Sequence, residues 1–154
     1  MNADPKIVTA LLDLFSDERK AENQYLSHYS QCENAGLTKL AASIRERAAD
    51  ERRHADLLAA RLSLFCAEPV AALTDEVGAE TEAVSMFAAE LTLENTARDK
   101  YNAAIKLAVE VADNDTRALL ESILKDETDH THEIEQAQDQ IDLLGLQNYY
   151  TTQV

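Results

Sequence analysis

Apolar residues recur along this sequence at steps of three, four or seven positions, which places them on one face of an α-helix. Four long stretches follow this pattern, at approximately residues 5–35, 38–66, 81–112 and 115–144. A fifth stretch, 147–152, has room for only one or two helical turns. The pattern therefore predicts an all-α protein with four long helices and one short helix.

The residues between these stretches are of the kinds that begin and end helices. Asp4 precedes a proline, which is typical of a helix start, and we expect Thr38 to cap the second helix. Asp113 lies where the third helix breaks and can cap the fourth helix, which Gly145 ends. Few residues separate the first helix from the second, or the third from the fourth. Each of these pairs should therefore form an antiparallel hairpin.

The connection between the second and third helices, at about residues 66–80, is much longer than the other two. A connection of this length reaches on the order of 50 Å when extended, enough to run along the whole bundle. The second and third helices can therefore run parallel, which an up-down-up-down bundle would not need. We expect one domain over residues 1–154, a length that can bury a sizeable core.

Four glutamates occupy positions in the helical stripes where apolar residues are expected. The second and fourth of them each begin a Glu-x-x-His motif. The first glutamate precedes the second by 33 residues, 18 to 51, and the third precedes the fourth by the same 33 residues, 94 to 127. Adding 76 to a residue number maps the first half of this pattern onto the second, so the sequence contains one helical hairpin twice. The six candidate metal ligands are Glu18, Glu51, His54, Glu94, Glu127 and His130.

A buried carboxylate costs several kcal/mol, and four together repel one another unless a cation binds among them. Four glutamates carry four negative charges, which two divalent ions neutralise. Two lone glutamates and two Glu-x-x-His helices form the ligand pattern of di-iron carboxylate bundles. Oxygen ligands with two imidazoles suit iron or manganese, and zinc can occupy the same site without redox chemistry. We therefore expect two iron ions per chain.

Residues next to the motifs are candidates for a supporting role. Asp50 and Asp126 each precede a motif glutamate, and we expect Asp126 to hold His54 and Asp50 to hold His130. The alternative is that both aspartates are surface charges. His132 follows the second motif by about 200° around the helix and should face away from the metals.

A tyrosine lies two helical turns after the first stripe glutamate. Tyr25 is a candidate hydrogen-bond partner of a ligand and a candidate electron donor, although a tyrosine in a helical core is also ordinary. The shift of 76 maps it onto Tyr101, for which the same role has less support. We expect His28 to lie beside the centre, without a role in it.

The charge balance limits the partners of this protein. Asp and Glu number 29 against 14 Lys and Arg, a net charge of −15, which repels nucleic acid and attracts cations. No stretch approaches the length of about 20 apolar residues that a membrane span requires. Cys32 and Cys66 form no paired motif, and we expect reduced thiols in a cytoplasmic protein.

In these motifs, and in the ending Gly145-Leu146-Gln147-Asn148-Tyr149, the whole chain resembles bacterioferritins. The resemblance implies a ferritin-like four-helix bundle in a hollow shell of 24 copies that stores a ferric mineral. It also implies an iron-oxidising centre within each subunit, with Glu51 and Glu127 bridging the two irons and O₂ or H₂O₂ as the oxidant.

The sequence departs from this family at two positions. The family holds haem with a methionine where this chain has Arg52, so we expect no haem. Some members carry an inner-surface histidine where this chain has Glu46, which could bind iron there together with Asp50.

Three other interpretations are less favoured. A rubrerythrin-like peroxidase usually adds CxxC pairs, which this sequence lacks. A DNA-shielding mini-ferritin builds its metal site between subunits, whereas here all six candidate ligands lie in one chain. A subunit of a mixed, haem-containing shell is the remaining alternative, and the complete ligand set argues against a non-catalytic one.

Overall fold

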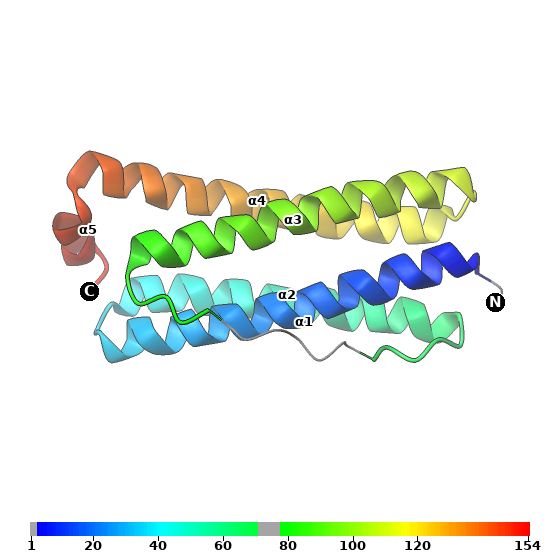
Figure 1. The fold of residues 1–154 in the computed structure, drawn as a ribbon, viewed down its shortest axis with the longest axis horizontal. Coiled ribbons are helices and arrows are strands. Elements are labelled where there is room, and N and C mark those ends of the chain that lie inside the picture. The colour runs from blue at the N-terminus through cyan, green and yellow to red at the C-terminus, as the bar shows by residue number, and fades with distance from the viewer. Residues whose placement is uncertain (1–2, 71–77) are drawn as a thin grey trace.

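The computed structural model describes residues 3–70 and 78–154, and within them it contains five helices. Their bounds are α1 Pro5–Asn34, α2 Thr38–Leu64, α3 Ala83–Glu110, α4 Asn114–Leu144 and α5 Leu146–Thr152. Figure 1 shows two antiparallel hairpins, α1 with α2 and α3 with α4, packed together with α5 across one end. In the same view α2 and α3 run in the same direction, as the long connection predicts. The prediction of an all-α four-helix bundle with a short fifth helix is confirmed.

Local signals start and end most of these helices as predicted. The Asp4 side chain accepts a hydrogen bond from the Lys6 backbone N–H at 2.8 Å, and the Asp113 side chain accepts one from the Thr116 N–H at 3.1 Å. The prediction for Thr38 was wrong: Thr38 is the first residue of α2, and Leu37 in the cap position makes no side-chain hydrogen bond.

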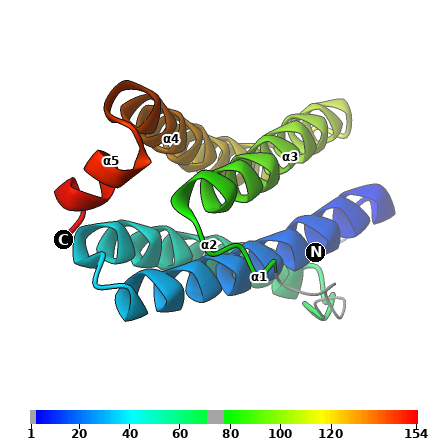
Figure 2. The same ribbon diagram turned by 60° about the vertical axis from the view of Figure 1, so that its left-hand side comes forward.

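A different part of the chain supplies the missing cap of α2. The backbone carbonyl of Gln153, just after α5, accepts a hydrogen bond from the Lys39 N–H at 2.9 Å. Figure 2 shows α5 reaching from the end of α4 towards the start of α2. The Tyr150 hydroxyl also accepts a hydrogen bond from the N–H of Ala83, the first residue of α3. The short helix α5 therefore satisfies backbone donors at the start of two long helices.

Two apolar clusters fill the two ends of the bundle and leave its middle polar. The cluster near α5 includes Ile44, Phe87 and Tyr149, and the cluster at the other end includes Leu58 and Leu120, all buried. Each large apolar side chain buried in this way stabilises the fold by about 1.5–3 kcal/mol. The helices are therefore held from both ends, and the region between the clusters is free to carry polar groups.

Two apolar residues that fit the helical period are exposed. Val84 is 48% exposed and Leu144 is 41% exposed. Val84 lies in the first turn of α3, where Ala83 and Phe87 are buried, so its own side chain lies on the uncovered side of that turn; Leu144 lies in the last turn of α4. Among the described residues, no helix is long and apolar enough to cross a membrane.

The two hairpins have matching turns. The first helix of each hairpin ends at Asn34 and Glu110, and the second begins at Thr38 and Asn114, so both pairs of bounds differ by 76. The residue in the left-handed backbone conformation is Gly36 in one turn, with φ of 75°, and Ala112 in the other, with φ of 58°. The duplication seen in the sequence thus extends to the backbone.

Candidate metal centre

The middle of the bundle gathers all six candidate ligands. None is more than 5% exposed, and their ligand atoms form two groups in which all atoms lie within 4.8 Å of one another. One group is Glu18, Glu51, His54 and Glu127, and the other is Glu51, Glu94, Glu127 and His130. Glu51 and Glu127 belong to both groups, so the arrangement offers two adjacent positions for an ion with two shared carboxylates.

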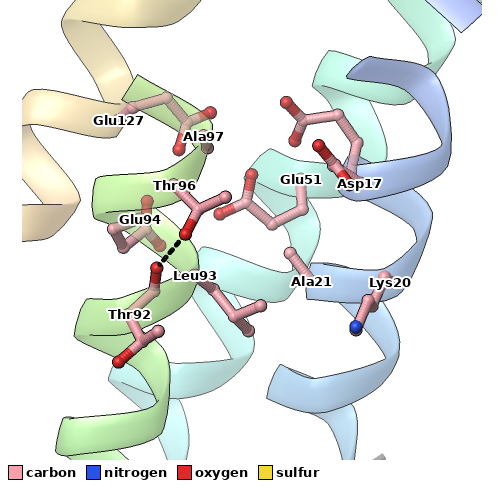
Figure 3. Close-up of a pocket in the computed structure, with 11 residues that line it drawn as sticks. Asp17, Lys20, Ala21, Glu51, Thr92, Leu93, Glu94, Thr96, Ala97 and Glu127 are labelled. Carbon is pink, nitrogen blue, oxygen red and sulfur yellow. Dashed lines mark hydrogen bonds between the residues drawn. The ribbon is translucent and has the colours of Figure 1, made fainter. Parts of the chain in front are cut away.

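The helices position these residues by simple geometry. Glu51 and His54 lie one turn apart on α2, as do Glu127 and His130 on α4, so each pair shares one face of its helix. A cavity of about 250 Å³ lies against the four glutamates and extends between α1 and α3. Figure 3 shows Glu51, Glu94 and Glu127 around this space, with Ala21 and Ala97 on opposite sides of it.

Each imidazole presents one nitrogen to the centre and the other to an aspartate. His54 Nδ1 lies 2.8 Å from Glu127 and 3.0 Å from Glu51, and His130 Nδ1 lies 3.2 Å from Glu51. The outer nitrogens are 3.4 Å from Asp126 for His54 and 3.4 Å from Asp50 for His130. The two aspartates thus lie opposite the histidines with which we paired them from the sequence, and their supporting role stays a prediction.

The sequence analysis missed Arg53, which joins the two aspartates. Its guanidinium donates a hydrogen bond to Asp126 at 2.8 Å and another to Asp50 at 3.0 Å. This contact spans α2 and α4 and holds both carboxylates beside the outer nitrogens of the histidines. Its spacing of three residues from Asp50 was visible in the sequence, whereas its approach to Asp126 depends on how the hairpins pack.

Both tyrosines contact a lone glutamate of the other hairpin. The phenol of Tyr25 donates a hydrogen bond to Glu94, and the phenol of Tyr101 donates one to Glu18. Both rings are fully buried. The sequence favoured Tyr25 over Tyr101, but the structure gives the two phenols equivalent contacts with the candidate ligands.

The pKa values of both lone glutamates and both histidines are raised, whereas hydrogen bonds with the two histidines outweigh burial and lower the pKa of Glu127. Burial raises the pKa of Glu18 well above its usual value and that of Glu94 to about 8. Burial alone would lower the pKa of His54, but hydrogen bonds with three glutamates outweigh it and raise that pKa to about 12. The pKa of His130 is raised for the same reason. Without metal, the centre therefore retains protons that balance its carboxylate charge.

The residues present fit a pair of divalent ions. Several buried atoms of the centre make no hydrogen bond of good geometry in the described structure, although some lie within ion-pair distance of one another: Glu51 Oε1, Glu94 Oε2, Glu127 Oε1 and His130 Nδ1. Unpaired buried polar atoms are costly, and all four belong to residues of the metal-binding groups. A carboxylate-rich set with two imidazoles matches the preference of iron and manganese.

The remaining candidates lie outside this centre. Glu46 is exposed and Asp50 is half-buried on α2, and iron binding by this pair stays a prediction. His132 is exposed and hydrogen-bonds with Gln136 at 3.0 Å, away from the centre as expected. His28 also lies outside the metal-binding groups; it is completely buried and contacts Glu90 at 2.7 Å. Its burial depends on contacts with α3 and the crossover that its position in the sequence does not show.

A ferritin-like domain family matches residues 8–144 of the chain. The bacterial ferritin of Neisseria meningitidis serogroup B is 34% identical over the full length of both proteins. The bacterioferritin of Mycolicibacterium paratuberculosis is 31% identical over 97% of this chain and 94% of its own length. Among solved structures, Mycobacterium tuberculosis bacterioferritin matches with a TM-score of 0.96 at 29% identity, covering 100% of this chain and 97% of its own.

Rhodobacter capsulatus bacterioferritin also matches with a TM-score of 0.96, at 27% identity, over 100% of this chain and 96% of its own. That structure is described as having a metal-free dinuclear site and a haem iron in a crystallographic special position.

Proposed function

This chain belongs to the bacterioferritins of the ferritin-like family, and on that premise we propose that it stores iron and oxidises Fe(II) at the six-residue centre. The observation that carries the proposal is the pair of buried ligand groups that share Glu51 and Glu127. Glu18 and His54 would complete one Fe(II) position, and Glu94 and His130 would complete the other. Four carboxylates and two neutral imidazoles balance the charge of two divalent ions.

The paired arrangement suits a two-electron oxidation. Each Fe(II) gives up one electron, so two ions held side by side together reduce O₂ to H₂O₂ or H₂O₂ to water. Pairing the electrons avoids the release of one-electron radicals. Asp50 and Asp126 would keep the inner nitrogen of each imidazole free for the metal by accepting the outer N–H. Tyr25 is a candidate donor of a further electron.

The oxidised iron needs a protected place, and we propose that 24 copies of this chain enclose it in a hollow shell. The similarity to bacterioferritins over the whole chain supports this assembly. We also propose a cytoplasmic location, since Cys32 and the exposed Cys66 are both free thiols, as is usual in a reducing compartment.

Haem binding by this subunit alone does not fit the side chains present. Arg52 is exposed and lies 3.8 Å from Glu22, and a guanidinium has no lone pair to offer to iron. The chain contains two methionines, and Met86 is buried on α3 beside Cys32. We therefore propose a haem-free subunit, which could still join a mixed shell with a haem-binding sibling.

The proposal is tested by Glu18→Ala and His130→Ala, each of which removes one ligand. We expect both variants to lose the fast phase of Fe(III) formation, at least about 100-fold, because one metal position is lost, while light scattering shows an unchanged particle. Glu135→Ala, an exposed change on α4, is the matched control. Running the assay with O₂ and with H₂O₂ identifies the oxidant. Oxidation by Glu18→Ala at the parent rate would place the reaction elsewhere.

A further inference from the structure

A second group of charged side chains is buried outside the metal centre. His28, Arg47 and Glu90, which we call the buried charge cluster, are 0%, 4% and 0% exposed. His28 lies 2.7 Å from one oxygen of Glu90, and Arg47 lies 3.3 Å from the other. The three residues come from α1, α2 and α3, so the cluster joins both hairpins.

The buried charge cluster contacts the centre through Tyr25. The Arg47 guanidinium lies over the Tyr25 ring, 5.5 Å from its centroid, and the Tyr25 phenol donates its hydrogen bond to Glu94. Arg47 is itself fixed by Glu90 and by a 3.3 Å hydrogen bond to Ser43. The path from the cluster to the centre therefore runs from Arg47 through the ring of Tyr25 to the carboxylate of Glu94.

At the positions related by the internal repeat, the described structure has no such cluster. The shift of 76 maps the buried charge cluster onto three apolar residues, which are Ala104, Ile123 and Leu14. All three are at most 5% exposed and pack in the same apolar cluster as Tyr101. Tyr101 donates to Glu18 as Tyr25 donates to Glu94, but the positions occupied by the buried charge cluster near Tyr25 are apolar near Tyr101.

This difference requires an explanation, because an apolar set fills the equivalent space in the same molecule. A buried ion pair is often no more stabilising than apolar residues of similar volume. Arg47 has a planar cation that fits flat over an aromatic ring, an arrangement that restricts the ring. Glu90 in turn restricts Arg47 through one carboxylate oxygen, while His28 contacts the other oxygen.

We infer that Arg47, held by Glu90, is a positioning residue that acts through Tyr25 to fix the metal-binding orientation of Glu94. The inference rests on the proposed function, in which Glu94 and His130 complete one metal position. It makes the two positions unequal: the Glu94–His130 position depends on Arg47, and the Glu18–His54 position does not.

The sign of the effect separates positioning from simple electrostatics. Arg47 and a divalent cation nearby repel each other. On electrostatic grounds alone, removing the positive charge of Arg47 would therefore strengthen binding of the cation. Loss of positioning weakens that binding instead, typically 10–100-fold for a residue that orients a ligand. A variant that removes Arg47 therefore gives opposite results under the two explanations.

The experiment titrates the intact metal-free protein with Co(II), followed by its visible absorption. The Glu18→Ala background reports the Glu94–His130 position, and the Glu94→Ala background reports the Glu18–His54 position. We expect Arg47→Leu to weaken Co(II) binding about tenfold in the first background and to leave it unchanged in the second. Because Arg47→Leu leaves Glu90 without its cation, the double change Arg47→Leu with Glu90→Gln is titrated alongside it.

A double-mutant cycle tests the route through the phenol. In the Tyr25→Phe background, Arg47→Leu should cause no further loss of Co(II) affinity, because the contact between phenol and Glu94 is already absent. Arg47→Lys keeps the charge but not the planar group over the ring, and we expect it to restore only part of the affinity. If Arg47 only stabilised the fold, Arg47→Leu would lower the free energy of unfolding by the same amount in the parent and in the Tyr25→Phe background.

The outcomes separate this inference from the proposed function. If the unchanged chain binds no Co(II), the metal centre itself is wrong. If the chain binds two Co(II) and Arg47→Leu strengthens binding, or weakens both positions equally, the positioning role is wrong and the metal centre stands. The inference is supported if Arg47→Leu weakens Co(II) binding at the Glu94–His130 position alone and has no such effect in the Tyr25→Phe background.

Discussion

The two hairpins contribute the same ligands to the centre but are built differently at their turns. In the α1–α2 turn, Gly36 takes the left-handed conformation and Leu37 provides no side-chain cap. In the α3–α4 turn, Ala112 takes that conformation and Asp113 caps the next helix. The same backbone therefore forms from different residues. The first turn has the glycine that the left-handed conformation favours but no capping side chain, and the second has the capping aspartate but an alanine in the left-handed conformation.

The same contrast appears around the metal centre. Arg53 links Asp50 and Asp126 on one side, whereas its counterpart Asp129 pairs with Lys125 on the surface of α4 at 2.7 Å. Side chains that face the centre are repeated in the two halves, and many that face other surroundings are not. A duplicated metal site can therefore have different surrounding contacts in its two halves.

The largest effect that we expect is on the coupling of metal binding to protons. The raised pKa values of Glu18, Glu94, His54 and His130 mean that the metal-free centre holds protons that two divalent ions must displace. Below the pKa of Glu94, about 8, loading should release about four protons, so affinity rises steeply with pH.

Above that pH Glu94 is already ionised, and the dependence should become weaker by one proton. An indicator dye that counts protons during Co(II) titration, between about pH 6 and about pH 9, measures this slope. Release of no protons would contradict the charge balance of the centre. If the slope of metal affinity against pH does not change near pH 8, the pKa assigned to Glu94 is wrong.

The second prediction concerns the two aspartates. Asp126→Asn and Asp50→Asn should each weaken metal binding by 10–100-fold, because an amide is a poorer acceptor for the outer N–H of a ligating imidazole. Asp129→Asn, on the surface of the same helix, should leave affinity unchanged and serves as the control. Anaerobic Fe(II) titration followed calorimetrically gives the affinities. Unchanged binding in both variants would return Asp50 and Asp126 to the role of surface charges.

Much of this architecture was readable from the sequence. The helix bounds follow from the apolar period and from local caps, and the ligands were visible as glutamates in apolar stripes. His28 and Arg53 were not recognised, because their contacts join residues of different helices whose spacing the sequence does not specify. Val84 fits the stripe by period but lies on the solvent side of a turn whose Ala83 and Phe87 are buried, so periodicity alone overestimated its burial.

The smallest expected effect lies at the turns and tests the comparison directly. Ala112→Gly should stabilise the metal-free protein by about 1 kcal/mol, because a left-handed conformation strains alanine but not glycine. Gly36→Ala should destabilise it by a similar amount, since a methyl group there would meet no atom within 4 Å and only the backbone conformation opposes it. Urea unfolding measures both changes, and shifts of the same sign would show that the turns are not equivalent.

The cap that Gln153 provides for α2 has a consequence for the order in which the fold is completed. The Lys39 backbone N–H donates to the Gln153 carbonyl, and the Lys39 side chain donates to the Thr152 carbonyl. Lys39 and Thr152 are 113 residues apart in the sequence. At about 5–20 residues per second, a ribosome adds the later partner on the order of 6–20 s after the earlier one. During that interval the start of α2 has only water for its free N–H. The first hairpin can therefore form early during translation, but it acquires its final contacts only when residues 146–153 emerge.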